Sequence, residues 1–420
     1  MIAQRIQRLR LLDPAVYMFL AAAALVGFAI DGGIFSVLFN LYMVRMGYGT
    51  ETIGLVIAAG QLVFAAASLP AGMIGERWGA RRMLSAGLAI MAAGCALLAV
   101  ADMVPPEVRV GWLIANCVVL YVGLALFFVN GAPYLLTLVG ESQRSAIFGA
   151  QVGALALAAF VGSLVGGFLP QLLGGLVGAL PHEPAAFRVS LLTAAAALVP
   201  AAAIVVAARP VEAHAPGGAV SPEAAPHSAA GAVAGLLAVM GLVRLLQVAG
   251  LASTSAFFNV YLDTQLQVPT EQIGMITAVG RLLAAPAALV TPLLTARYGN
   301  HSTVIWSSAA TALAMLPLAL VPHWSAAGLS FVGVVGVSSI RYASSLVYFI
   351  GLVPPNRRGT LAGLNEMAAG VSFTAMTFGG GYLIALVGYR SLFLVGAALT
   401  GLSVLLFALA FRGRRDGRRR

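Results

Sequence analysis

Long apolar runs, separated by short segments rich in glycine, proline or arginine, fill most of this chain of 420 residues. The first run follows Asp13 and Pro14 and extends to about Val44. Eleven more lie at about 52–74, 83–103, 110–139, 145–170, 188–208, 233–262, 271–295, 302–321, 325–353, 360–387 and 390–411. A helix needs about 20 apolar residues to cross a bilayer. The pattern therefore predicts an all-α membrane protein with twelve transmembrane helices. The first run exceeds the 7–15 apolar residues, roughly, of a signal peptide, so we expect it to be the first of these helices.

One segment interrupts the pattern. Residues 209–232 are rich in alanine, proline, glycine and serine and have no apolar period, which is typical of a flexible linker. We therefore expect an N-terminal six-helix bundle at 1–208, a cytoplasmic linker at 209–232 and a C-terminal six-helix bundle at 233–420 with a basic tail. The two bundles repeat each other, because FNLYMV from Phe39 matches FNVYLD from Phe258, and GGFL from Gly166 matches GGYL from Gly380.

The composition agrees with a membrane protein and adds an orientation. Hydrophobic residues make up 60% of the chain and charged residues 9%, against roughly 25% charged residues in soluble domains. All 24 basic residues are arginines, and with the N-terminus inside, most of them fall on cytoplasmic segments. This predicts that both termini are cytoplasmic. The net charge is +10, but the arginines form no basic face interleaved with aromatic residues. We therefore expect no nucleic-acid partner.

The segment between the second and third runs, GMIGERWGARR from Gly72 to Arg82, is a tight hairpin at a membrane surface. Its spacing, G-x-x-x-(D/E)-R-x-G-x-(R/K)-(R/K), resembles the signature loop of the major facilitator superfamily. The resemblance implies two six-helix bundles related by pseudo-twofold symmetry, with the substrate site between them. It also implies a cytoplasmic gate formed by the loop's conserved positions, which here are Gly72, Glu76, Arg77, Gly79, Arg81 and Arg82. In the second bundle the matching loop has Ala296 in place of the acidic residue.

Five charged residues lie inside the predicted spans, and none has a charged counterpart in the other bundle. They are Asp31, Arg244, Arg281, Arg341 and Glu366. A charge at the bilayer centre costs at least about 2.5–3.5 kcal/mol on insertion scales, so each needs a partner or a wet cavity.

These charges suggest distinct roles. Arg281 and Arg341, near the middle of their helices, are candidate substrate ligands for a carboxylate or phosphate. Asp31 is either a proton carrier or the permanent ion partner of an arginine. Arg244 and Glu366 lie nearer the cytoplasmic ends, where a gating or salt-bridge role is favoured. Four polar residues are candidate cavity lining or, alternatively, interhelical hydrogen bonds: Gln61, Asn130, Tyr134 and Gln247.

Motifs typical of enzymes are absent from the sequence, so we expect neither catalysis nor a cofactor or metal. The main hypothesis is a monomeric secondary transporter in a bacterial inner membrane. It would move a small organic, in particular an anionic, solute by alternating access, as a symporter or an antiporter coupled to protons or a counter-solute. Membrane lipids are its other expected partners. One alternative is a proton-driven exporter of drugs or lipids. GSLVGG from Gly162 resembles a motif of such exporters, but Ser163 replaces its proline, and close helix packing also accounts for these glycines. The alternative from another class is a membrane sensor or scaffold that does not transport.

Overall fold

The computed structural model describes residues 13–208, 227–353 and 358–412. Within these ranges the chain is helical and contains no strand. Eleven helical segments are long and apolar enough to cross a membrane, and α10 (Thr270–Tyr298), with 29 residues, covers the eighth predicted span. The prediction of an all-α membrane protein with twelve transmembrane helices is confirmed.

The helices of the first half lie close to the predicted runs. The first run forms two helices, and each later one forms a single long helix. They are α2 (Pro14–Ala29), α3 (Ile34–Arg45), α4 (Thr50–Trp78), α5 (Ala80–Ala99), α6 (Pro106–Leu138), α7 (Glu141–Gly174) and α8 (Pro184–Ala207). Two short 3₁₀ helices, η1 (Ala101–Met103) and η2 (Gly175–Val177), follow α5 and α7. Proline in the first turn of α2, α6 and α8 suits a helix start, because the first amide groups have no partner within the helix.

The second half follows the same plan. Its helices are α9 (His227–Thr264), α10, α11 (Asn300–Ala314), α12 (Leu316–Leu320), α13 (Trp324–Leu352), α14 (Arg358–Val387) and α15 (Tyr389–Ala410). Most of the predicted linker, residues 209–226, lies outside the described residues. The helix that follows it begins at His227, six residues before the predicted start at 233.

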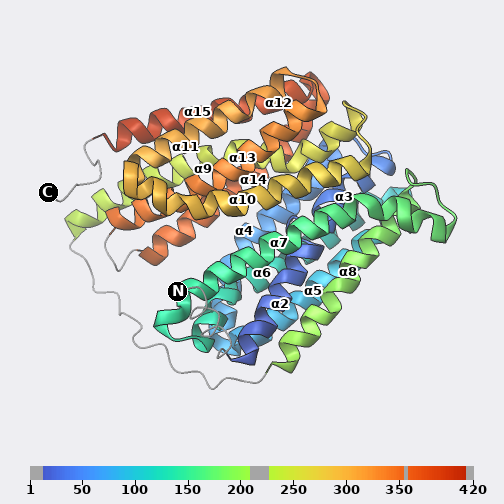
Figure 1. Ribbon diagram of the computed structural model, residues 1–420, viewed down its shortest axis with the longest axis horizontal. Helices are drawn as coiled ribbons and strands as arrows, with labels where there is room; N and C mark the ends of the chain where they lie inside the picture. The colour runs from blue at the N-terminus through green and yellow to red at the C-terminus, as the bar shows by residue number, and fades with distance from the viewer. Residues whose placement is uncertain (1–12, 209–226, 354–357, 413–420) are drawn as a thin grey trace. The chain divides into compact units, whose positions relative to one another are not determined.

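Contacts between Cα atoms divide the chain into two compact units. Unit 1 comprises Met1–Tyr42 and Ala66–Gly218, and unit 2 comprises Met43–Ala65 and Ala219–Arg420, so the first part of α4 is grouped with the second half of the chain. In unit 1, α5 packs against α6 and α8, and α2 packs against α7 and α8 (Figure 1). In unit 2, α9 packs against α13, α14 and α15, and α13 also contacts α10 and α11 (Figure 1).

The first span is broken between α2 and α3, at Ile30–Gly33, where the sequence has Gly32 and Gly33. Gly32 has a φ of +85°, which favours glycine. The Ser36 hydroxyl donates to the Ile30 carbonyl at 2.7 Å, and the Ser163 hydroxyl of α7 donates to the Gly32 carbonyl. These bonds satisfy carbonyl groups that a continuous helix would have paired.

Small residues of the GSLVGG motif bring α7 close to this break. A Cβ at Gly162 would overlap the Phe28 carbonyl, and one at Gly166 would lie 3.1 Å from the Ile34 Cα. The motif therefore packs against the first span, which agrees with the packing alternative for these glycines.

The turn that ends the signature loop recurs in unit 2. Gly79, with a φ of +89°, joins α4 to α5, and Gly299, with a φ of +81°, joins α10 to α11. Both positions keep the glycine that such a φ favours, as the sequence repeat predicts.

Candidate functional site

A cluster of polar and charged side chains lies among α9, α13 and α14 of unit 2. We call it the Arg341 cluster. On α13, residues three and four positions apart share one face, and the serines of the cluster flank its arginine at these spacings. Its members are Arg244 and Gln247 of α9, Ser338, Arg341, Tyr342 and Ser345 of α13, and Asn365 and Glu366 of α14.

Arg341 is the most deeply buried charged residue of the cluster. Its side chain is 1% exposed, and one terminal nitrogen, Nη2, donates to the Ser338 hydroxyl at 3.1 Å. Its Nε and Nη1 atoms are buried and have no hydrogen-bond acceptor among the described residues. An unpaired buried charge costs several kcal/mol, so this position favours an acceptor supplied from outside the protein.

Arg244 has more interactions within the cluster than Arg341. Its guanidinium carbon lies 4.9 Å from the centre of the Tyr342 ring, a cation–π contact. The Tyr342 hydroxyl donates to Glu366 Oε1 at 3.2 Å, and the Asn365 amide donates to the same oxygen at 3.0 Å. Arg244 is attracted to Glu366 and repels Arg341. Glu366, which is exposed, and the buried Arg244 therefore contact the same tyrosine, while Arg341 forms no ion pair with any residue that the structure describes.

Gln247 adds a further donor to the cluster. Its side chain is fully buried, and its Oε1 accepts from the Ser345 hydroxyl at 3.5 Å. Its Nε2 group, like Nε of Arg244, has no acceptor among the described residues. The cluster thus has an excess of N–H donors and of positive charge, which together suit an anionic ligand.

The other predicted substrate arginine lies apart from this cluster. Arg281 is half-buried on α10, and its buried Nε has no acceptor among the described residues. Although α10 packs against α13, no hydrogen bond joins Arg281 to the members of the Arg341 cluster among the described residues. The structure therefore brings Arg341 together with the two residues predicted at a gate, Arg244 and Glu366, rather than with Arg281.

Asp31 lies in the break between α2 and α3 and is half-buried. Its amide donates to the Val26 carbonyl at 3.0 Å. Within the described ranges its carboxylate makes no ion pair, so the predicted alternative of a permanent arginine partner has no support there.

The predicted lining residues have different surroundings. The Asn130 amide donates to the Leu126 carbonyl of its own helix at 2.9 Å and to the Ala71 carbonyl of α4 at 3.2 Å. The second bond connects two helices, which agrees with the alternative role predicted for this residue. The Tyr134 ring packs 5.7 Å from the Phe19 ring, and its buried hydroxyl has no partner among the described residues. Gln61 is half-buried on α4.

The signature loop is surface-exposed for the most part. Gly72 packs near Val129, and Glu76, Arg77 and Arg82 are exposed. The Arg81 side chain donates from Nε to the Val205 carbonyl at 3.2 Å and from Nη2 to the Val206 carbonyl. It thereby satisfies carbonyls of the last turn of α8, which a helix end leaves unpaired.

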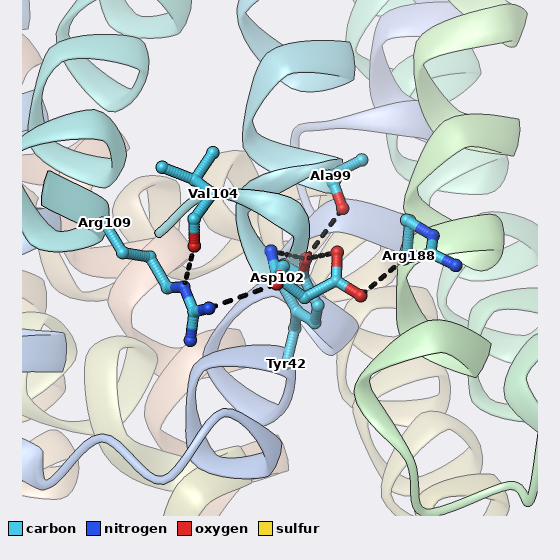
Figure 2. Close-up of polar contacts among 6 residues, drawn as sticks. All are labelled: Tyr42, Ala99, Asp102, Val104, Arg109 and Arg188. Carbon is cyan, nitrogen blue, oxygen red and sulfur yellow. Dashed lines mark hydrogen bonds and ion pairs between the residues drawn. The ribbon is translucent and has the colours of Figure 1, made fainter. Parts of the chain in front are cut away.

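A second polar group, the Asp102 network, joins α3, η1, α6 and α8 in unit 1 (Figure 2). Arg188 of α8 donates to Asp102 Oδ2 at 2.7 Å. The Tyr42 hydroxyl lies 2.8 Å from Asp102 Oδ1 and 2.7 Å from the Ala99 carbonyl, and it accepts from the Asp102 amide at 2.9 Å. Arg109 donates to the carbonyls of Asp102 and Val104 at 3.1 and 2.9 Å.

Sequence reasoning missed several members of both groups. Tyr342, Asn365 and the two serines of α13 gave no signal beyond being polar residues in apolar runs. Asp102 lies in η1, which in the sequence resembles an ordinary loop. A further ion pair was also missed: Arg45 of α3 binds Asp263 of α9 with both terminal nitrogens, at 2.7 and 2.5 Å.

Comparison with known proteins identifies the family. The sequence model of the Major Facilitator Superfamily matches residues 20–340 and 240–420. The multidrug resistance protein MdtH of Klebsiella pneumoniae (strain 342) is 31% identical over 141 residues, which is 33% of this chain and 34% of that protein. MdtH of Yersinia pestis (strain Pestoides F) is 29% identical over 141 residues, with the same coverage. The alignments thus span about a third of the length of these curated relatives.

Solved structures agree on the fold. A mutant of the nucleoside transporter NupG has a TM-score of 0.74 at 17% identity, covering 94% of this chain and 100% of that one. A D-xylose-proton symporter has a TM-score of 0.74 at 13% identity, covering 93% of this chain and 96% of that one. With the family's sequence model covering the chain from residue 20 to residue 420, this protein belongs to the Major Facilitator Superfamily of membrane transporters.

Proposed function

We propose that this chain is a secondary active transporter that moves a small organic anion across the cytoplasmic membrane by alternating access. The observation that carries this proposal is Arg341, whose guanidinium is 1% exposed and has two nitrogen atoms without an acceptor in the described part of the chain. A carboxylate or phosphate oxygen is the ligand that such a group binds most strongly. Arg281, also with an unpaired buried nitrogen, would contact the same solute at another stage of the cycle.

Proton coupling fits the position of Asp31. A carboxylate at a helix break, without an ion pair among the described residues, is able to take up and release a proton as its access to water changes. In this mechanism the bundles predicted at 1–208 and 233–420 alternate between two states, with both termini in the cytoplasm. The loop from Gly72 would latch the cytoplasmic side. Glu76→Arg should then slow flux and leave the melting temperature unchanged. Normal flux in this variant would contradict the latching role of the loop.

The test begins with ligand binding. A ligand that binds only the folded state raises the melting temperature of the purified protein by mass action. We expect small organic anions to stabilise the parent protein but not Arg341→Gln, and to stabilise Arg390→Gln normally, because Arg390 is an exposed arginine of the same unit. Equal stabilisation of the parent and Arg341→Gln by every active anion would contradict the proposal.

Flux in liposomes completes the test. An anion identified by its stabilising effect should enter vesicles in the presence of the protein, and an imposed pH gradient should drive it if protons are coupled. Asp31→Asn should then bind the anion but respond weakly to the gradient. Binding without flux would favour the sensor or scaffold.

A second candidate is a proton-driven multidrug exporter. It is favoured by the match to MdtH, which is named a multidrug resistance protein and aligns with about a third of this chain. Stabilisation by hydrophobic cations, equal in the parent and in Arg341→Gln, would support this candidate over the anion transporter.

A further inference from the structure

The charges of the Arg341 cluster form a short series along the three helices. Arg244 and Arg341 are buried, and the Arg244 guanidinium packs on the ring of Tyr342, the residue next to Arg341 in the chain. Glu366, which is exposed, accepts from the hydroxyl of the same tyrosine. Two positive charges and one negative charge leave the cluster with a net charge of +1. The half-buried Arg281 of α10 is outside this series.

Glu366 is fixed in this role by two donors from different helices. The Tyr342 hydroxyl and the Asn365 amide both bind its Oε1. Tyr342 at the same time packs its ring against the Arg244 guanidinium. The tyrosine therefore holds the carboxylate and the compensated arginine as one unit, beside an arginine that remains uncompensated.

From this arrangement we infer that the site takes a singly charged organic anion, a monocarboxylate in its simplest form, and that Glu366 determines this selectivity. The inference rests on the proposed function and specifies its substrate class. A monoanion would bring the cluster to neutrality and offer acceptors to the unpaired donors of Arg341 and Gln247. A dianion would leave an uncompensated negative charge beside the buried Arg341, which is disfavoured.

Substitution of Glu366 by glutamine changes the charge but keeps the shape. The glutamine carbonyl still accepts from Tyr342 and Asn365, while the cluster acquires a net charge of +2. We therefore expect Glu366→Gln to prefer dianions, with the ratio of the two affinities shifted by about tenfold or more. The double variant Arg244→Gln/Glu366→Gln returns the cluster to +1 and should prefer monoanions again.

The experiment measures the melting temperature of the full chain with pairs of straight-chain mono- and dicarboxylates of equal carbon number, from acetate and oxalate to octanoate and suberate. Affinities follow from the dependence of the shift on concentration. Glu271→Gln is the matched control, because it removes one acidic charge in the first turn of α10, outside the cluster. We expect monoanion preference in the parent and the control, reversal in Glu366→Gln, and restoration in the double variant.

The outcomes separate the two levels of the proposal. If carboxylates bind in an Arg341-dependent manner but Glu366→Gln leaves their ratio unchanged, the selectivity inference is wrong and the anion transporter stands. If a reversed ratio fails to revert in the double variant, the charge of the cluster is not its cause and the inference is also wrong. If no carboxylate stabilises the parent while hydrophobic cations do, the anion transporter itself is wrong.

Discussion

The Asp102 network of unit 1 and the Arg341 cluster of unit 2 are built from the same chemical groups: arginines, one carboxylate and a tyrosine hydroxyl. In the Asp102 network the carboxylate binds an arginine directly, at 2.7 Å, and the tyrosine hydroxyl both donates and accepts. In the Arg341 cluster the carboxylate binds a tyrosine and an asparagine instead, and the buried arginine keeps two nitrogen atoms without an acceptor.

The comparison shows that the presence of charge inside a membrane protein does not by itself distinguish scaffold from site. What differs is whether the polar groups are satisfied by one another. A satisfied network contributes to stability, and removing one partner is costly because it leaves the others unpaired. In the proposed function, the unpaired groups of the Arg341 cluster would instead gain their acceptors from the bound anion.

The largest effect on stability is expected from Asp102→Ala. Arg188 would lose its acceptor and Tyr42 would keep only the Ala99 carbonyl, so we expect a loss of about 2–4 kcal/mol in the free energy of unfolding. Unfolding in detergent measures this directly. Ligand stabilisation of the remaining folded protein should be unchanged. A stability equal to that of the parent would mean that the network contributes nothing.

We expect Arg341→Leu to change the free energy of unfolding in the opposite direction. Removing an unpaired buried charge and filling its volume with an apolar side chain is expected to stabilise the empty protein by about 1–3 kcal/mol. Stabilisation by anions and flux should both be lost. If the variant is destabilised as much as Asp102→Ala, the guanidinium has a structural partner and the comparison fails.

The ion pair of Arg45 and Asp263 provides an intermediate case, since it is a satisfied pair within unit 2. Asp263 is 9% exposed and Arg45 20%, and both terminal nitrogens are engaged. A double-mutant cycle with Arg45→Ala and Asp263→Ala should give a coupling energy of about 1–2 kcal/mol. A coupling near zero would show that satisfaction of a pair in this unit does not stabilise it.

The smallest contrast is between two tyrosines. Tyr42→Phe removes a hydroxyl with three hydrogen-bond contacts, and we expect a loss of about 1 kcal/mol. Tyr342→Phe keeps the ring beside Arg244, and Asn365 still binds Glu366, so we expect a loss below about 0.5 kcal/mol. Thermal unfolding of both variants measures the difference. An equal loss in the two would contradict the distinction between the groups.

Much of the fold was accessible from the sequence, because apolar runs bounded by glycine, proline and arginine determine where membrane helices begin and end. The turns at Gly79 and Gly299 lie in the two loops that the sequence repeat had already matched. Arg341 stood out because a charge among apolar residues needs an explanation.

The grouping of the site residues was not accessible. Arg244, Arg341 and Glu366 come from three helices far apart in the sequence, and only tertiary packing shows that a tyrosine connects two of them. Asn130 and Arg81 were predicted as lining and gate residues, but the partners found for them are backbone carbonyls. No pattern of side chains reports such partners. The roles in transport remain predictions for the experiments above.

The break in the first span also has a mechanical meaning. A continuous helix of 32 residues would be about 48 Å long and stiff along its length. With the joint at Ile30–Gly33, the span consists of two short rods, and part of the stiffness of the joint comes from outside, through the hydroxyl of Ser163 on α7. A displacement of α7 would therefore act on this joint through the Ser163 hydrogen bond, so the flexibility of the first span depends on a neighbouring helix.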